Sequence, residues 1–169
     1  MNLRNTILAE HSSAQTAKIV KWIGSNQQRF DQLFHLFLKD EYRVIQRAAW
    51  PLSYCVRNHP KLISKHFTKL VKNLRQPNLH DAVKRNTVRI LEAIDIPQKL
   101  HGEVMDICFG YITDPKEKVA VKAFSLTVLQ RLSRQYPDIS NELKVIIEER
   151  WPHETAAFRS RAKKILAGN

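Results

Sequence analysis

The sequence predicts an all-α fold built from consecutive helix pairs, and three observations support this prediction. Apolar residues recur at steps of three and four, which is the period of one helix face. Strand signals are nearly absent, because the chain has no long alternation of apolar and polar residues and no Asn-Gly or Asp-Gly turn. Six of the seven prolines stand at breaks between helical segments, where proline is tolerated; Pro51 is the exception and is expected to kink a helix.

The predicted helices follow one another with short connections. Residues 1–25 are expected to form an N-terminal cap of one or two helices, and the 169 residues together a single helical-repeat domain. Four helix pairs follow the cap, over residues 26–59, 60–96, 97–136 and 137–169. The first helices of these pairs are predicted over 26–39, 61–75, 98–112 and 138–150.

The second helices of the pairs align with one another, which favours a repeat architecture over the alternative of an ordinary helical bundle. One aligned column holds the small residues Ala48, Thr87, Ala123 and Ala162. Apolar columns flank it on both sides, with Val44, Val83, Val119 and Phe158 before it and Pro51, Ile90, Leu126 and Ile165 after it. A small residue between apolar ones allows close packing against neighbouring helices.

This pattern resembles the HEAT/armadillo-like superfamily of helical repeats. Residues 40–49, and residues 118–123 after Asp114–Pro115, look like the Asp, Val and Ala positions of a HEAT second helix, and Val83–Lys84 is similar to the family's Val-Arg pair. The resemblance covers residues 26–169. It implies a right-handed helical solenoid, an α-α superhelix, whose second helices line the concave side.

Positive charge is concentrated in one part of the chain. Residues 42–91 contain eleven basic residues and one acidic residue, Asp81, and so hold +10 of the net charge of +12. The flanking residues 1–41 and 92–169 each carry a net charge of +1. Such an asymmetry indicates an anionic partner, either nucleic acid or an acidic protein surface.

The helix predicted over 41–58 combines arginines with aromatic residues on one side. Arg43, Arg47 and Arg57 share this side with Trp50 and Tyr54, because successive helical residues turn by about 100°. Arginine pairs with phosphate or carboxylate, and aromatic rings stack on bases. The alternative interpretation is that Trp50 and Tyr54 pack against the adjoining repeat while the arginines are solvated.

The repeat alignment extends this stripe into a predicted basic ladder. Asn86, Lys122 and Arg161 fall in the column of Arg47, and Arg89, Ser125 and Lys164 in that of Trp50. The binding residues predicted on this basis are Arg43, Arg47, Trp50, Tyr54, Arg57, Arg85, Arg89, Lys118, Lys122 and Arg161. The helix 61–75 carries a second stripe, which is either a solvated face or a further binding surface: Lys61, Lys65, Lys69, Lys72 and Arg75.

Several kinds of chemistry lack their sequence motifs. The four glycines are too far apart to form a phosphate-binding loop. Neither a His-Glu-x-x-His nor a Cys-x-x-Cys motif for zinc occurs. No cofactor, metal site or catalytic residue is therefore assigned. Cys55 and Cys108 lie in apolar helical patterns and are expected to be buried, reduced thiols. No apolar run approaches the ~18 residues of a membrane span, and no secretory signal is recognisable, so a cytoplasmic location without membrane contact is expected.

The predicted function is therefore non-catalytic binding of an anionic partner, most of all nucleic acid. A protein-interaction scaffold is the first alternative. The second is a DNA glycosylase, because residues 42–50 and 122–131 are mildly similar to bacterial alkylpurine glycosylases with HEAT-like repeats. This chain has Ser125 where a pocket tryptophan would stand and lacks those enzymes' Trp-Asp-x-Val-Asp type of segment, so the resemblance implies DNA binding more than glycosylase chemistry.

Overall fold

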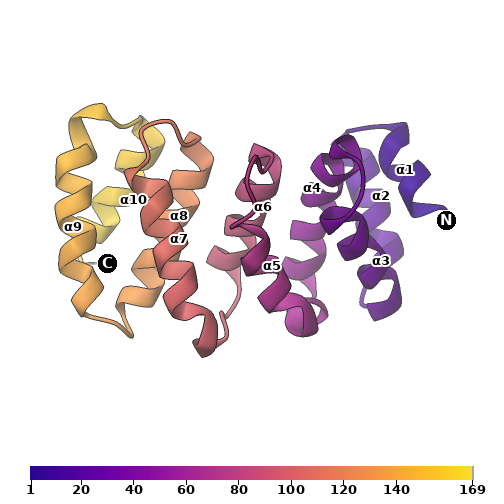
Figure 1. The fold of residues 1–169 in the computed structure, drawn as a ribbon, viewed down its shortest axis with the longest axis horizontal. Coiled ribbons are helices and arrows are strands. Elements are labelled where there is room, and N and C mark those ends of the chain that lie inside the picture. The colour runs from indigo at the N-terminus through magenta and orange to yellow at the C-terminus, as the bar shows by residue number, and fades with distance from the viewer. Residues whose placement is uncertain (169) are drawn as a thin grey trace. The chain divides into compact units, whose positions relative to one another are not determined.

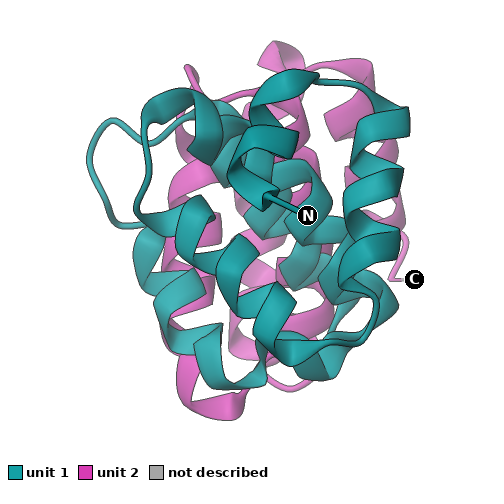
Figure 2. Cartoon of the chain, turned by 90° about the vertical axis from the view of Figure 1, so that its right-hand side faces the viewer, with its two compact units in different colours: residues 1–94 teal, residues 95–169 magenta. Residues whose placement is uncertain are grey.

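The computed structural model describes residues 1–168, and every regular element within them is a helix (Figure 1). The chain divides into two compact units, Met1–Ile94 and Asp95–Asn169, which Figure 2 shows in different colours. The prediction that the whole chain forms one domain stays a prediction.

Unit 1 is organised around one long helix, α4 (Tyr42–Asn58). The other elements of the unit are α1 (Leu3–Ala9), α2 (Ser13–Ile23), α3 (Gln27–Leu38), the 3-10 helix η1 (Pro60–His66), α5 (Phe67–Asn73) and α6 (Asp81–Ala93). Helix α4 packs against α1, α2, α3 and α6. Because α4 contacts all four, its polar side chains can meet groups from both the N-terminal cap and the following repeat.

The first three helices of unit 1 begin at residues that satisfy free backbone N–H groups. The side chains of Asn2, Ser12 and Asn26 accept hydrogen bonds from backbone N–H groups three residues later. Asparagine and serine are favoured at this position for that reason. The cap therefore contains two helices, α1 and α2, within the range that the sequence predicts.

Unit 2 is organised in the same way around α8 (Val119–Ser133). It also contains the 3-10 helices η2 (Gln98–Leu100) and η3 (Trp151–His153), together with α7 (His101–Thr113), α9 (Asp138–Arg150) and α10 (Ala156–Leu166). Helix α8 packs against α7, α9 and α10 (Figure 1). Both central helices are second helices of predicted pairs.

Most of the predicted helices are present, but two of the predicted first helices begin as 3-10 helices. In unit 2, the helix expected over 98–112 begins as η2 and continues as α7. The helix expected over 61–75 is split into the 3-10 helix η1 and the short helix α5. Helix α4 continues through Pro51, although proline has no N–H group to donate to the hydrogen bonds of the helix. Next to it, the Ser53 hydroxyl donates a hydrogen bond to the Trp50 carbonyl at 2.9 Å.

The small-residue column is buried in both units, as predicted. Ala48, Thr87, Ala123 and Ala162 are each at most 5% exposed. The flanking apolar column contains one error, because Val119 is 42% exposed. Val119 is the first residue of α8, and Val121 takes the buried position instead.

The two cysteines are free and buried, in agreement with the expectation from the sequence. Burial raises the pKa of each thiol to about 12. Both thiols are therefore protonated at neutral pH and unreactive. Among the described residues, no helix has the combination of length and apolar character needed to cross a bilayer.

Candidate functional site

Two arginines of α6 line a cavity of about 280 Å³ in unit 1. The side chains that line it are His11, Trp50, Arg85, Asn86 and Arg89. Arg85 and Arg89 are four residues apart, so helical geometry places them on the same side of α6. Trp50 comes from α4, and His11 from the connection between α1 and α2.

The cavity is lined by two positively charged side chains, those of Arg85 and Arg89. No ion pair joins Arg85 or Arg89 to a carboxylate within residues 1–168. Burial first, and then the charges of Arg47 and Arg85, lower the pKa of His11 from its ordinary value. The side chains that line the cavity include two arginines and no acid, so the site disfavours a further cation and is suited to an anion.

Aromatic rings form one wall of this site. Trp50 packs edge-on against the His11 ring at 5.7 Å between centroids, and its centroid lies 6.5 Å from that of Tyr54. The guanidinium carbon of Arg89 lies 5.1 Å from the Tyr54 ring centroid, and that of Arg57 lies 5.9 Å away. Interaction with the Arg89 side chain, followed by that with Trp50, lowers the pKa of the Tyr54 hydroxyl. The arginines are thus held against ring faces rather than against acids.

A second, more apolar cavity of about 440 Å³ adjoins the same wall. It lies between α2 and α4, and its lining residues are Ser13, Thr16, Ala17, Val20, Lys21, Trp50, Tyr54 and Asn58. Trp50 lines both cavities, and Tyr54 connects this cavity to Arg89. A basic site and an apolar site are therefore separated by no more than one aromatic residue.

Arg47 does not belong to the exposed stripe that the sequence predicts. Its Nη1 atom donates hydrogen bonds to the carbonyls of Leu8, at 2.7 Å, and Ile7, at 3.4 Å. Both carbonyls are near the C-terminal end of α1, where carbonyls lack helical partners. Arg47 is half-buried and holds α1 against α4, so the expected full exposure is not found, while its role in binding stays a prediction.

The other predicted residues of unit 1 differ in exposure. Arg43 and Arg57 are exposed, and Arg85 is exposed as well, whereas Trp50, Tyr54 and Arg89 are half-buried. Asn86, which the alignment places in the column of Arg47, is 3% exposed and donates to the Ala82 carbonyl at 2.8 Å. The rings of Trp50 and Tyr54 contact neighbouring rings and also line a cavity, so both interpretations of these residues stay open.

The predicted residues of unit 2 are mostly engaged inside that unit. Lys122 is 3% exposed, and its Nζ atom lies 2.7 Å from Oε1 of the buried Glu154. The prediction of Lys122 on an exposed ladder is therefore wrong, because an amphipathic pattern cannot show that an acid from a neighbouring element accompanies a lysine into the core. Arg161 donates to the Thr127 hydroxyl at 2.5 Å and covers the Phe124 ring. Lys118 is exposed at the N-cap of α8.

One lysine of the second stripe, over residues 61–75, pairs with an acid from a different helix. Lys65 pairs at 2.6 Å with Asp31 of α3, which also contacts the His66 ring at 2.7 Å. Burial alone would raise the pKa of Asp31, but hydrogen bonds from Lys65, His66 and Gln27 outweigh it and lower the pKa to about 2. Lys61, Lys69 and Lys72 of this stripe are exposed.

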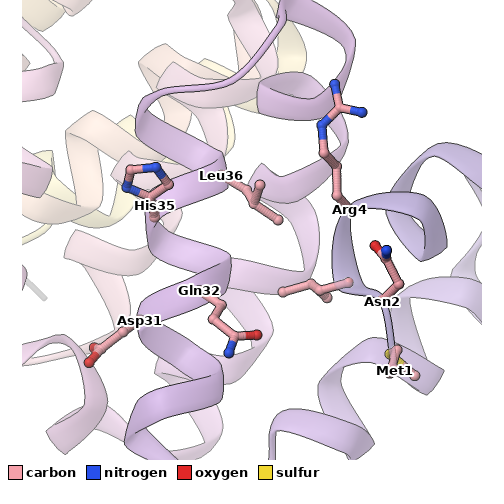
Figure 3. A pocket seen from close by; sticks show the side chains of 8 residues that line it. Met1, Asn2, Arg4, Asp31, Gln32, His35 and Leu36 are labelled. Atoms are coloured by element: carbon pink, nitrogen blue, oxygen red, sulfur yellow. The ribbon is translucent and has the colours of Figure 1, made fainter.

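A larger cavity of about 570 Å³ between α1 and α3 offers less chemistry (Figure 3). Arg4 and Asp31 contribute charge at its edge, but Figure 3 shows both side chains directed away from the space between the helices. Arg4 is paired with Asp40 at 3.0 Å, and Asp31 with Lys65. Because these charges are already neutralised by partners, the Arg85–Arg89 cavity is the stronger candidate.

Sequence reasoning missed the contribution of the N-terminal cap to the site. His11, Thr16 and Ala17 line the two cavities, yet they lie outside the repeats and in no aligned column. No local motif marks them. Their contribution follows from the packing of the cap against α4, and helix periodicity does not reveal which helices pack together.

The comparisons with known proteins agree with this architecture. In each unit, the second helix of a pair, α4 or α8, packs against most of the other helices. This arrangement is typical of helical-repeat proteins. The family model for HEAT repeat domains matches residues 3–169, so the chain belongs to the HEAT repeat family, and its all-α HEAT-like fold class is confirmed. No curated protein and no solved structure shows significant similarity to it. HEAT repeats typically mediate binding to proteins or other partners. Within residues 1–168, no group of three histidine, cysteine or acidic side chains is placed to hold a metal ion.

Proposed function

We propose that this HEAT repeat protein is a non-catalytic nucleic-acid-binding module, and that unit 1 carries its main binding surface. The observation that carries the proposal is the pair Arg85 and Arg89, which has no carboxylate partner among the described residues and faces an aromatic wall. The exposed Arg43 and Arg57 extend the same charge along α4. Trp50 and Tyr54 supply the stacking faces.

Arginine without an acid partner is suited to phosphate. A guanidinium group offers several donors in a planar fork, which pairs with two phosphate oxygens at once. Nucleic acid also provides flat bases, which stack on aromatic rings and contribute about 1–3 kcal/mol per base. An acidic protein surface would use the arginines but would have less need of the rings, so the combination supports nucleic acid over the protein scaffold.

The location of the net charge supports the same conclusion. Unit 1 has 16 basic and six acidic residues, a net charge of +10, while unit 2 has 12 and ten, a net charge of +2. A concentrated positive field speeds the approach of a polyanion and raises its local concentration. Lys118 and Arg161 stay predicted binding residues of unit 2.

The test is fluorescence anisotropy of labelled single- and double-stranded DNA at several salt concentrations. The variant is Arg85→Gln/Arg89→Gln, which keeps hydrogen-bonding groups and removes two charges. Its matched control is Lys18→Gln/Lys39→Gln, which removes two charges from exposed positions of the same unit that lie outside both predicted stripes and both cavities.

The proposal predicts affinity that falls steeply with log salt, because each neutralised phosphate releases counterions. The Arg85/Arg89 variant is expected to bind more weakly and with a shallower salt dependence than the lysine control. Equal weakening by the two variants would mean that only overall charge matters. Weak binding that neither variant changes would favour a protein partner.

A further inference from the structure

We propose that the nucleic acid bound by unit 1 is single-stranded, with one unstacked base in the cavity between α2 and α4 and its neighbouring phosphates at Arg85 and Arg89. This inference rests on the proposed function. It adds the strand type and a base site that the arginines alone do not define.

The shape and lining of the cavity fit a flat heterocycle. Its volume of about 440 Å³ falls within the range of small-ligand sites. Helix α2 contributes Thr16, Ala17 and Val20, which form an apolar side. Helix α4 contributes Trp50 and Tyr54 on the opposite side. Such a combination of small aliphatic groups and rings favours a planar aromatic group.

Polar groups stand at the edge of the cavity, where they can contact the edge of a base. Ser13, Lys21 and Asn58 are exposed or lie at helix ends, and all three line the cavity. A hydroxyl, an ammonium and an amide provide both donors and acceptors. A small number of polar groups around an apolar centre is typical of a site that fixes the orientation of its ligand.

The charge next to this cavity complements the rest of a nucleotide. Trp50 lines both the apolar cavity and the cavity of Arg85 and Arg89. Arg89 also lies over Tyr54, the second ring of the apolar cavity. A ligand that fills both cavities must therefore join a planar apolar group to a nearby anionic group, and a base with its adjoining phosphates does so.

Single strands fit this arrangement better than duplexes. The faces of paired bases are covered by their stacked neighbours, so a duplex base could reach the Trp50 cavity only after unstacking and unpairing. In a single strand the base faces are accessible, and stacking on protein aromatics is tolerant of sequence. The site therefore predicts a preference for unpaired strands with little sequence specificity.

The experiment compares ligands that have equal numbers of phosphates but different bases. The probes are a short single-stranded DNA, an RNA of the same sequence, the DNA duplex, and a single strand whose sugars carry no bases. The full chain is compared with Ala17→Trp, in which an exposed residue of α2 would fill the cavity. Ala14→Trp is the matched control, because Ala14 is exposed on the same helix and does not line the cavity.

The wild-type chain is expected to bind the base-bearing strand about tenfold more tightly than the abasic strand. Ala17→Trp should abolish this difference, whereas Ala14→Trp should keep it. The DNA and RNA probes differ in the 2′-hydroxyl, so their relative affinities identify which strand the site prefers. Thermal unfolding monitored by circular dichroism shows whether both variants remain folded.

Two results would overturn the inference while leaving the proposed function intact. One is equal, salt-dependent binding of the abasic and base-bearing strands. The other is tighter binding of the duplex than of either single strand. If no probe binds in a salt-dependent manner, the proposed function itself fails, so the two failures are distinguishable.

Discussion

Units 1 and 2 use related helices, but one predicted binding cluster in unit 1 and one predicted binding residue in unit 2 lie in opposite environments. In unit 1, Arg85 and Arg89 of α6 face His11, Trp50 and Tyr54, with no ion pair to a carboxylate among the described residues. In unit 2, Lys122 of α8 is buried against Glu154, which also receives Arg150. A repeat alignment thus predicts where a cation lies along a helix, while the neighbouring elements decide whether it is available to a ligand.

The largest expected effect is the loss of the buried carboxylate in unit 2. Glu154→Gln leaves the cations of Lys122 and Arg150 together without their shared anion, whose Oε1 atom lies 2.7 Å from each. Removal of one partner from a buried ion pair typically costs about 3–5 kcal/mol. We expect this loss in the free energy of unfolding measured with urea.

Glu142→Gln in α9 is the matched control, because this glutamate is exposed. It should change the free energy of unfolding by no more than about 0.5 kcal/mol. Equal stabilities of the two variants would contradict the assignment of the Lys122 site as structural.

The next effect concerns a packing rule that the two units share. Ala48 of α4 and Ala123 of α8 occupy the same aligned column and are 0% and 5% exposed. Ala48→Leu and Ala123→Leu should each overpack a helix interface and cost about 1–3 kcal/mol, measured by thermal and urea unfolding. Ala14→Leu on the exposed face of α2 is the control. A neutral effect at either buried position would disprove the shared register.

A smaller effect distinguishes two arginines of the same helix. Arg47→Gln removes hydrogen bonds to the carbonyls of Leu8 and Ile7, and we expect a loss of about 1–2 kcal/mol in the free energy of unfolding. Arg43→Gln, at an exposed position one turn earlier, should be nearly neutral. The reverse order of these two effects would show that the inner and outer sides of α4 are misassigned.

The smallest effect is a pH dependence in unit 1. Asp31 has a folded-state pKa of about 2, below its ordinary value of 3.8, because Lys65, His66 and Gln27 hydrogen-bond to it. Its contribution to stability is therefore complete above the ordinary pKa and is lost as the pH falls through 3.8 towards 2. Solvent screening limits this contribution to at most about 1 kcal/mol.

Asp31→Asn should consequently flatten the fall of the unfolding free energy over this acidic range. The comparison is made by urea unfolding at a series of pH values. Glu10→Gln, at an exposed carboxylate of the α1–α2 connection, is the control and should leave the slope of the wild type unchanged. Identical acid profiles for Asp31→Asn and the wild type would rule out the proposed role of the Asp31 contacts.

The sequence was sufficient for the fold because helix periodicity and proline positions are local signals. The column of Ala48, Thr87, Ala123 and Ala162 predicted burial correctly, since packing distance restricts side-chain size at such a position. The one wrong apolar assignment, Val119, lies at a helix end, where periodicity does not fix the direction of a side chain.

The candidate site was harder to predict because it depends on contacts between distant segments. The sequence indicated Arg85, Arg89, Trp50 and Tyr54 as candidate residues, and the structure brings them close together. It could not show that Arg47 would bind α1 carbonyls, 39 residues away in sequence, or that Glu154 would meet Lys122, 32 residues away. Both outcomes depend on tertiary packing, which leaves no periodic pattern in the sequence.

The most direct test of the difference between the units is the salt dependence of single-stranded DNA binding in two charge-matched variants. Arg85→Gln/Arg89→Gln removes two charges from unit 1, and Lys163→Gln/Lys164→Gln removes two from the exposed part of α10 in unit 2, where Lys164 aligns with Arg89. Each phosphate contact contributes about −0.7 to the slope of log affinity against log salt for single strands. We predict that the arginine variant reduces the magnitude of this slope by about 1.4 and that the lysine variant leaves it unchanged; equal reductions in both would contradict the assignment of the binding surface to unit 1.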